Sequence, residues 1–250
     1  RLAPAPFARG GMRYAFALLD EGNGQKLVAK VYAFKDMEFQ SLPVFEGDMM
    51  TQAYAMYLAD DWSRRIPDTA LEFVQAQLAK CPAGAPFELM AVEPFIPGNY
   101  TKQTNNHSYV RADSELAQAF SHFTWHRTGG ELMVADIQGV QTTLTDPQIH
   151  CDRDCFGRGN FGKNGMDAFF LSHRCGVTCK ALNLKECPVQ LRSRPEIPEW
   201  RSTEDDPDED SADRRILDVV HAHALFDAAV HAAAQRALSS PPQEEDLESG

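Results

Sequence analysis

Four short motifs in the second half of the chain decide what kind of domain it forms: V-A-D-I-Q-G-V at 134–140, L-T-D-P-Q-I-H at 144–150, F-G-R-G-N-F-G at 156–162 and H-R-C-G-V-T-C at 173–179. They contain two aspartates, a glycine-rich loop and three residues that bind soft metal ions, and His122 lies just upstream. Such a set can supply a metal–nucleotide site, a phosphate clamp and a structural zinc. Phosphoryl transfer needs the first two of these.

The bulk composition is that of an ordinary globular protein. The 250 residues are 43% hydrophobic and 24% charged, which is enough for one large domain or two small ones. A formal net charge of −12 argues against a protein that holds nucleic acid on a basic surface. No apolar run approaches the length of about 18 residues that a membrane span requires. We therefore expect neither a nucleic-acid partner nor a membrane partner.

The ends of the chain and its cysteines suggest where it works. The first residues carry no apolar signal core, and the absence of an initiator Met indicates an excerpt of a longer chain. Six cysteines are too few for a disulfide scaffold, and four of them form two close pairs. This pattern favours metal binding in a reducing compartment, so we expect a cytoplasmic location.

Hydrophobic periodicity predicts a mixture of strands and helices. The expected elements are a hairpin from residue 7 with a turn at Gly10-Gly11, a strand at 26–32, a helical region at 48–80 with a second helix at 69–78, a strand at 87–95, a helix at 114–126, a β-hairpin arm at 131–140 closed at Gly129-Gly130, and one helix from 163 to 182. The prediction is an α+β domain over residues 1–186.

The composition changes after residue 186. Residues 187–212 are first rich in proline and then acidic, which predicts a linker. Residues 213–238 have the pattern of an amphipathic helix, and 239–250 that of a disordered tail. Ser202 and Thr203 precede the acidic run and belong either to a solvated linker or to an autophosphorylation segment.

Lys30 is the first candidate for phosphate binding. It lies in V-A-K-V-Y, where a lysine on a strand can reach the phosphates of a nucleotide. The alternative is an exposed strand lysine without a function. The turn from Gly10 to Arg13, about twenty residues upstream, favours the functional interpretation, because backbone N–H groups beside glycine can approach phosphate oxygens.

Asp136 and Asp146 are the candidate catalytic carboxylates. Phosphoryl transfer needs one carboxylate to hold Mg²⁺ and usually another to orient the attacking hydroxyl. We expect Gln138 to share a strand face with Asp136, because side chains on a strand repeat every second residue. The alternative makes Asp146 part of a D-P turn and Asp136 an ordinary residue at a strand end.

The glycine-rich loop from Gly157 to Gly162 has the spacing of a dinucleotide-binding motif, but its context is wrong. The preceding H-C-D-R-D-C segment is polar, and no βαβ unit surrounds the loop. Because the loop opens a helix, its N–H groups could face an anion or a substrate backbone.

His173, Cys175 and Cys179 supply three metal ligands, with the two cysteines four residues apart and therefore on one face of the expected helix. A closed zinc site needs a fourth ligand, for which spacing alone offers either His122 or the pair Cys151 and Cys155. The alternative is a set of buried thiols that bind no metal.

Taken together, these motifs resemble the alpha-kinase family of atypical protein kinases. F-A-R-G-G-M-R, V-A-K-V-Y, E-P-F-I-P-G-N-Y-T-K, A-F-S-H-F-T and the four motifs quoted first occur in the family's order between residues 7 and 184. The versions here are most similar to the elongation factor 2 kinase branch. The resemblance implies a two-lobed α+β kinase fold, with an N-lobe at about 1–97 and a zinc-stabilised C-lobe at about 98–186.

The resemblance also implies a role for each motif. It assigns the ATP phosphates to Lys30 and to the turn of Gly10, Gly11, Met12 and Arg13. Asp136 becomes the catalytic carboxylate with Gln138 beside it, and Asp146 the ligand of the Mg²⁺-nucleotide. The remaining assignments are Glu93 at the hinge beside the adenine, Asn160 as a residue that orders the active site, and a structural zinc on His122, His173, Cys175 and Cys179.

The implied activity is ATP-dependent phosphorylation of serine or, preferentially, threonine in a protein substrate, with elongation factor 2 as a candidate. The alternative is an inactive pseudokinase that serves as a zinc-stabilised interaction module. Either Glu46 or Asp48 is expected to pair with Lys30, and the C-D-R-D-C insert leaves room for a second metal or a redox pair.

Overall fold

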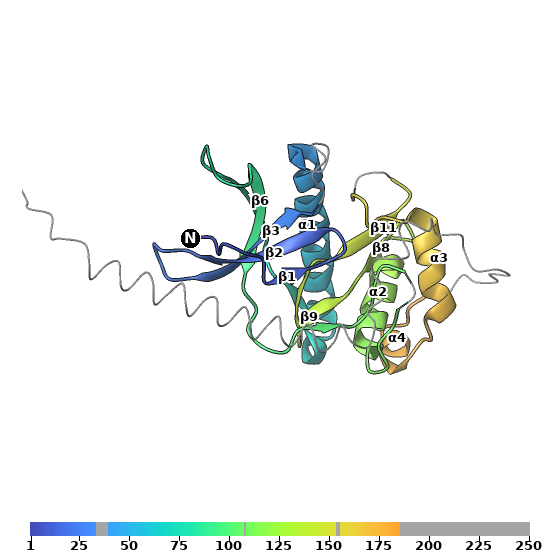
Figure 1. The fold of residues 1–250 in the computed structure, drawn as a ribbon. Coiled ribbons are helices and arrows are strands. Elements are labelled where there is room, and N and C mark those ends of the chain that lie inside the picture. The colour runs from blue at the N-terminus through green and yellow to red at the C-terminus, as the bar shows by residue number, and fades with distance from the viewer. Residues whose placement is uncertain (34–39, 108, 154–155, 186–250) are drawn as a thin grey trace, which may run out of the picture.

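The computed structural model describes residues 1–33, 40–107, 109–153 and 156–185. The linker, amphipathic helix and tail expected from residue 187 onward lie outside these ranges, as do Ser202 and Thr203. The described part is an α+β domain, as expected, in which one sheet stands apart from a second group of strands and helices (Figure 1). Within the described ranges no helix is long and apolar enough to cross a membrane.

The first sheet has five antiparallel strands in the order β1-β2-β3-β6-β5. Its strands are β1 (Ala8–Arg9), β2 (Arg13–Leu19), β3 (Lys26–Tyr32), β5 (Gln77–Lys80) and β6 (Leu89–Pro94). Central strand β3 is buried from Val28 to Tyr32, because apolar clusters pack on both faces of the sheet. This burial places Lys30 inside the domain and excludes the exposed-lysine alternative.

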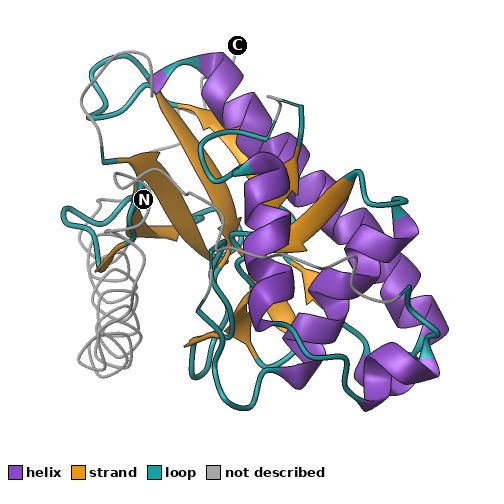
Figure 2. Ribbon diagram, turned by 90° about the vertical axis from the view of Figure 1, so that its right-hand side faces the viewer, coloured by secondary structure: helices purple, strands orange, loops and turns teal. Residues whose placement is uncertain are grey.

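Helix α1 (Leu42–Arg65) links the two halves of the domain. It packs against strands of both halves and against helix α2 (Glu115–Arg127) (Figure 2). Phe45 near its start contributes to the core beneath the first sheet, whereas Trp62 near its end belongs to the large core of the second half. The helix therefore fixes how the two halves face each other.

The second half contains two small sheets and three helices. The four-stranded sheet runs β4-β10-β9-β7, with β4 (Glu72–Phe73), β7 (Thr101–Lys102), β9 (Gln138–Val140) and β10 (Thr143–Thr145). Strands β8 (Leu132–Ala135) and β11 (Gln148–Cys151) form a separate pair, surrounded by α2 (Glu115–Arg127), α3 (Gly162–Ser172) and α4 (Val177–Ala181). Turns between these strands carry the aspartates of the predicted site.

The helix expected at 69–78 is wrong. A short 3₁₀ turn (Pro67–Thr69) leads into β4 and then β5. Leu71 and Phe73 are buried while Glu72 between them is exposed, which is the period of a strand. The apolar spacing of this segment fits either structure, and pairing of β4 with β10 decides it.

The hairpin arm expected at 131–140 is also wrong. Strand β8 pairs with β11 and strand β9 with β10, so the two halves of the segment belong to different sheets. Gly129-Gly130 joins α2 to β8 instead of closing a hairpin.

The single helix expected from 163 to 182 is interrupted. The backbone is extended at His173 (φ −66°, ψ 139°) and at Gly176 (φ −86°, ψ −162°), between α3 and α4. A Cβ at Gly176 would lie 2.3 Å from Glu115 Oε1, so the break permits close approach to α2. Cys175 lies in this extended stretch, and the expected shared helix face with Cys179 does not exist.

Candidate functional site

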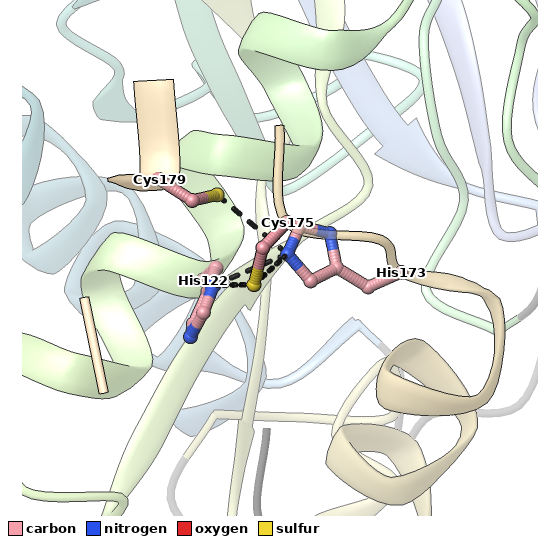
Figure 3. Close-up of side chains that lie close together, drawn as sticks. All are labelled: His122, His173, Cys175 and Cys179. Carbon is pink, nitrogen blue, oxygen red and sulfur yellow. Dashed lines mark hydrogen bonds between the residues drawn. The ribbon is translucent and has the colours of Figure 1, made fainter. Parts of the chain in front are cut away.

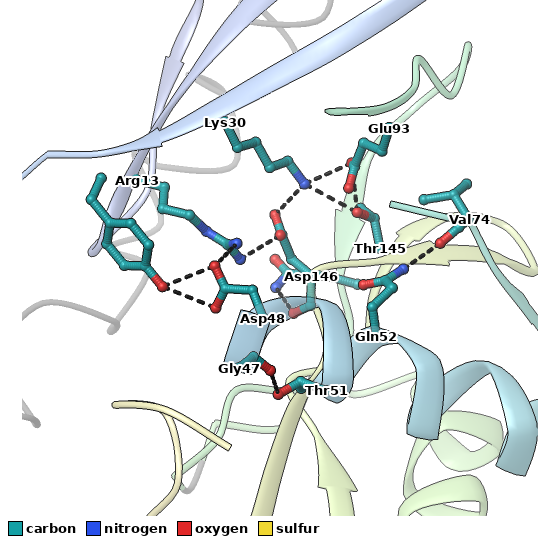
Figure 4. Close-up of polar contacts among 12 residues, drawn as sticks. Arg13, Lys30, Gly47, Asp48, Thr51, Gln52, Val74, Glu93, Thr145 and Asp146 are labelled. Atoms are coloured by element: carbon teal, nitrogen blue, oxygen red, sulfur yellow. Dashed lines mark hydrogen bonds and ion pairs between the residues drawn. The ribbon is translucent and has the colours of Figure 1, made fainter. Parts of the chain in front are cut away.

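A pocket between the first sheet, α1 and the β10–β11 turn gathers most of the predicted nucleotide-binding side chains (Figure 4). Its lining includes Met12, Arg13, Lys30, Tyr32, Asp48, Glu93, Asp146, Gln148, Arg158 and Gly159. Gly10 closes the turn between β1 and β2, because its N–H donates to the Arg13 carbonyl at 2.8 Å.

Lys30 stands at the centre of this pocket. Its Nζ lies 2.6 Å from Glu93 Oε1, 2.7 Å from Asp146 Oδ2 and 3.1 Å from Thr145 Oγ1. The carboxylate on β6 thus takes the place for which Glu46 or Asp48 of α1 was expected. Because the side chain of Glu93 faces Lys30, this residue has a structural role that sequence reasoning did not assign.

Arg13 forms an ion pair with the same aspartate, Asp146, and another with Asp48. Its guanidinium lies 2.6 Å from Asp146 Oδ1 and 3.0 Å from Asp48 Oδ2, and Tyr32 Oη donates to Asp48 at 2.9 Å. We call Arg13, Lys30, Asp48, Glu93 and Asp146 the charge cluster. Two cations and three carboxylates are therefore held together inside the protein.

The electrostatics follow from this arrangement. Burial alone would raise the pKa of Asp146, but Lys30 and Arg13 lower it to about 2. Burial works against the charged form of Arg13 too, and Asp146 and Asp48 nevertheless hold its pKa above the usual value. Asp48, where burial dominates, has a raised pKa. Asp146 is therefore a fixed anion at neutral pH, which suits a metal ligand.

Asp136 lies in the turn between β8 and β9 and not on a strand. Its φ is 56°, which is not the backbone of a strand. The expectation that Asp136 and Gln138 share one face of a strand is therefore wrong. Gln138 Nε2 instead donates to the Asp146 carbonyl at 3.2 Å, which ties the two turns together. Asp146 has a φ of 51°. Both candidate carboxylates therefore occupy left-handed backbone, a strain that concentrates at functional sites.

Lys102 is a residue that the sequence reasoning missed. It lies on β7, its side chain is 8% exposed, and its Nζ is 3.2 Å from Asp136 Oδ1. Buried lysines are rare unless they are paired, so this contact accounts for the burial of the Lys102 side chain. The only available signal was the position of Lys102 at the end of the E-P-F-I-P-G-N-Y-T-K run.

The glycine-rich loop is fastened to β11 instead of offering free N–H groups to an anion. The Asn160 side chain accepts from Cys151 N and donates to the Cys151 carbonyl, at 2.9 and 2.8 Å. The N–H groups of Phe161, Gly162 and Lys163 go to His150 Nδ1, Asn160 Oδ1 and Asp152 Oδ1. The anion-binding use of this helix start is therefore not supported, whereas the ordering role expected of Asn160 fits.

A second polar cluster lies in the other half of the domain, where His122, His173, Cys175 and Cys179 converge (Figure 3). We call it the His–Cys cluster. One ligand atom from each residue lies within 4.8 Å of all the others. Of the described residues, these four form the group, and Cys151 does not belong to it. Cys155 lies outside the described ranges, so the second metal or redox pair suggested by the C-D-R-D-C insert stays a prediction.

The spacing of the His–Cys cluster can be compared with that of a zinc site. Tetrahedral Zn²⁺ with Zn–N near 2.05 Å and Zn–S near 2.3 Å sets N···N at about 3.3 Å and N···S at about 3.6 Å. The two histidine nitrogens are 3.1 Å apart. His173 Nε2 lies 3.6 Å from both sulfur atoms, and His122 Nδ1 lies 3.7 Å from Cys175 Sγ. The donor set and these four distances fit a tetrahedral zinc ion, and the remaining two pairs of ligand atoms lie within 4.8 Å.

Burial favours the uncharged forms of these side chains. It lowers the pKa of His173 to about 4, which leaves a neutral imidazole with a free lone pair. It raises the pKa of Cys179 to about 12, so that this thiol becomes a thiolate only beside a positive charge.

Comparison with known proteins agrees with this architecture. A model of the alpha-kinase family matches residues 8–179. Alpha-protein kinase 1 of Dictyostelium discoideum is 40% identical over 188 residues, which cover 72% of this chain and 14% of that protein. Eukaryotic elongation factor 2 kinase of Mus musculus is 35% identical over 206 residues, covering 78% of this chain and 28% of that protein. The chain thus spans less than a third of the length of either relative.

Solved structures show the same fold. The alpha-kinase domain of myosin-II heavy chain kinase A in complex with AMP-PNP superposes with a TM-score of 0.68 at 27% identity, over 74% of this chain and 88% of that one. A complex of the same kinase domain with ADP gives the same values. The motif order, the fold and the matched residues agree, and the chain belongs to the alpha-kinase family of atypical protein kinases.

Proposed function

We propose that this chain is an ATP-dependent protein serine/threonine kinase of the alpha type that prefers threonine. The observation that carries the proposal is the charge cluster, in which Lys30 and Arg13 converge on Asp146 inside a pocket. Family membership supports it, since the similar crystal structures contain ADP and AMP-PNP. The similarity to elongation factor 2 kinases supports elongation factor 2 as a candidate substrate.

The charge balance of the site explains why a nucleotide would arrive with a metal ion. Arg13, Lys30 and Lys102 are cationic there, whereas Asp48, Glu93, Asp136 and Asp146 are anionic. A triphosphate added to a site that is already slightly negative needs a compensating cation. Mg²⁺, when bound, neutralises charge on the phosphate oxygens, and the Asp146 carboxylate would hold it.

The protein groups then act by position and charge. Arg13 and Lys30 would transfer part of their contacts from Asp146 to the phosphates, helped by the turn at Gly10 to Met12. Glu93 lies near the end of β6, where the hinge is expected, and would hold the Lys30 ammonium in place. Gln138 and Asn160 would keep the Asp146 turn and the glycine-rich loop in place.

Asp136 would orient the substrate hydroxyl and accept its proton. Its contact with Lys102 Nζ, at 3.2 Å, holds the carboxylate in place before the substrate arrives. Fixed charges that are already in place require no rearrangement as negative charge moves during transfer.

Transfer of the γ-phosphate from Mg-ATP to a threonine peptide, to its serine version and to elongation factor 2 tests this function. We expect Asp136→Asn to lower kcat by about 10²–10⁴-fold, the contribution of a positioned base. Asp146→Asn should abolish transfer. Asp60→Asn is the matched control, because Asp60 is exposed on α1 and pairs only with its helix neighbour Arg64 in the described contacts.

Near-native transfer by Asp146→Asn would overturn the assignment of this carboxylate. If the folded native chain neither transfers phosphate nor binds ATP, the protein is a pseudokinase. Equal rates on the two peptides would remove the threonine preference alone, and failure on elongation factor 2 would remove that substrate alone.

We further propose that the His–Cys cluster holds a structural zinc. The agreement between its distances and a tetrahedral site supports this. Zinc content, measured by mass spectrometry, should be one equivalent in the native chain and should fall in Cys179→Ser together with the melting temperature. Cys151→Ser is the control and should keep its zinc. The reverse result would show that the ligands are wrongly assigned.

A further inference from the structure

Each histidine of the His–Cys cluster has a second ring nitrogen that points away from the cluster to a carbonyl-type oxygen. His173 Nδ1 lies 3.0 Å from Gln118 Oε1. His122 Nε2 lies 2.8 Å from the backbone carbonyl of Lys185. Both oxygens can only accept a hydrogen bond. With the Gln118 amide in this orientation, both outer nitrogens donate and carry the ring protons.

The consequence for the inner nitrogens is direct. A neutral imidazole with its proton on one nitrogen has a bare lone pair on the other. In these tautomers the lone pairs of His173 Nε2 and His122 Nδ1 point into the cluster, 3.1 Å apart, beside the Cys175 and Cys179 sulfur atoms. A cation placed among them can be bound by both nitrogens. The outer partners therefore prepare both rings for a metal ion.

The Lys185 peptide is held from both sides. While its carbonyl accepts from His122, its own N–H donates to His126 Nδ1 at 2.8 Å. His122 and His126 lie one turn apart on α2, and both contact the backbone of Lys185. Leu182 and Leu184 pack against the large core just before it.

We propose that Gln118 and the Lys185 carbonyl form the outer shell of the zinc site, and that zinc binding anchors the chain at Lys185 against α2. This inference rests on the proposed zinc site. Gln118 acts as a positioning residue, because it touches the ligand His173 and not the metal.

A zinc-competition titration against a chromophoric chelator tests the outer shell. Gln118→Leu removes the acceptor and should weaken zinc binding by about 10–100-fold, the usual effect of losing such a partner. Gln118→Glu keeps an oxygen that accepts the same N–H and should bind within a few-fold of the native chain. Equal affinity of the native chain and Gln118→Leu would overturn the inference.

Thermal unfolding of the same proteins separates positioning from simple packing. Gln118 is buried, so Gln118→Leu can change stability without any metal. A positioning role predicts that the rise in melting temperature from excess chelator to saturating zinc shrinks in Gln118→Leu. A packing role would shift both melting temperatures equally and leave the rise unchanged, which would contradict the proposal.

Hydrogen exchange of the full chain tests the anchor. Removal of zinc should speed exchange of the Lys185 amide, while amides of β3 in the other half of the domain keep their rates. His126→Ala, which leaves all four ligands intact, should speed the Lys185 amide even with zinc bound. An unchanged Lys185 amide in both cases would overturn the anchor. Failure of the native chain to bind zinc would instead refute the zinc site itself.

Discussion

The charge cluster and the His–Cys cluster are both buried and polar, yet they differ in how their charges are balanced. In the charge cluster, Lys30 and Arg13 already neutralise most of the carboxylate charge within the protein. In the His–Cys cluster, two imidazoles and two thiols bring lone pairs and no permanent cation. The first can stand without a ligand, whereas the second is the cluster for which we propose a stabilising zinc ion.

This difference fits what each cluster would do. A reaction site must release its product, so its contacts have to be exchangeable, and Asp146 can pass its cationic partners to a phosphate and take them back. A structural metal site has to persist, since metal binding and folding share one free energy. Burial alone therefore does not distinguish a catalytic cluster from a structural one, but internal charge balance does.

The two clusters are joined through α3. Helix α3 begins at the glycine-rich loop and ends beside His173. The loop is hydrogen-bonded to β11, which is the strand that follows Asp146. A disturbance of α3 should therefore reach both clusters, and a disturbance within either one should stay local.

The largest effect is expected from Lys30→Met. Loss of the ammonium leaves Glu93 buried and Asp146 paired with Arg13 alone, and breaking a buried ion pair costs about 3–5 kcal/mol. Urea unfolding should show this loss, and kinase activity should disappear. Arg64→Met, at an exposed ion pair on α1, should cost at most about 1 kcal/mol. Equal costs for the two variants would mean that the charge cluster is not stabilised from within.

Gly165→Ala on α3 should have an intermediate effect. A Cβ there would lie 2.6 Å from three atoms of the buried His150 ring, and such overpacking costs about 1–3 kcal/mol. Because α3 joins the two clusters, both zinc affinity and kinase activity should fall. A second change, His150→Ala, should recover part of the lost stability. If only one cluster responds to Gly165→Ala, the proposed coupling through α3 is wrong.

The smallest effect is a pH dependence. The pKa of Asp146 is lowered to about 2 in the folded chain, so its ion pairs stabilise the fold fully above its unfolded value of about 4. That contribution is lost as the pH falls from about 4 to 2. The stability difference between the native chain and Asp146→Asn should shrink in this window. Burial lowers the pKa of His150 to about 4, so the unfolded chain binds a proton at this ring more readily than the folded chain does. The free energy of unfolding therefore starts to fall earlier on this account, between about pH 6.5 and 4.

How far the sequence predicts such a structure depends on the kind of signal. The α+β class and the convergence of four ligands from His122 to Cys179 were predicted, because ordered motifs carry that information. The shared helix face of Cys175 and Cys179, from which the sequence argued for zinc, was not predicted correctly, since Cys175 lies outside α4. At the break, Gly176 packs so closely against Glu115 of α2 that a side chain would not fit, and periodicity does not register such contacts.

The pairing of charges was equally hidden. Glu93 and Lys102 became partners of Lys30 and Asp136 only through strand neighbours distant in the chain, β6 beside β3 and β7 beside β9. Short segments with few apolar residues, such as Leu71 to Phe73, fit helix and strand equally well until a partner strand is known. Local patterns therefore predicted the residue types of the site, and sheet pairing determined their contacts.

Calorimetric unfolding of one native preparation tests the contrast between the clusters most directly. The protein would be heated as purified, with excess zinc chelator, after zinc is restored, and with Mg-ATP. We predict that chelation lowers the melting temperature by much more than Mg-ATP raises it, and that zinc reverses the loss. A melting temperature that chelation leaves unchanged would contradict the account.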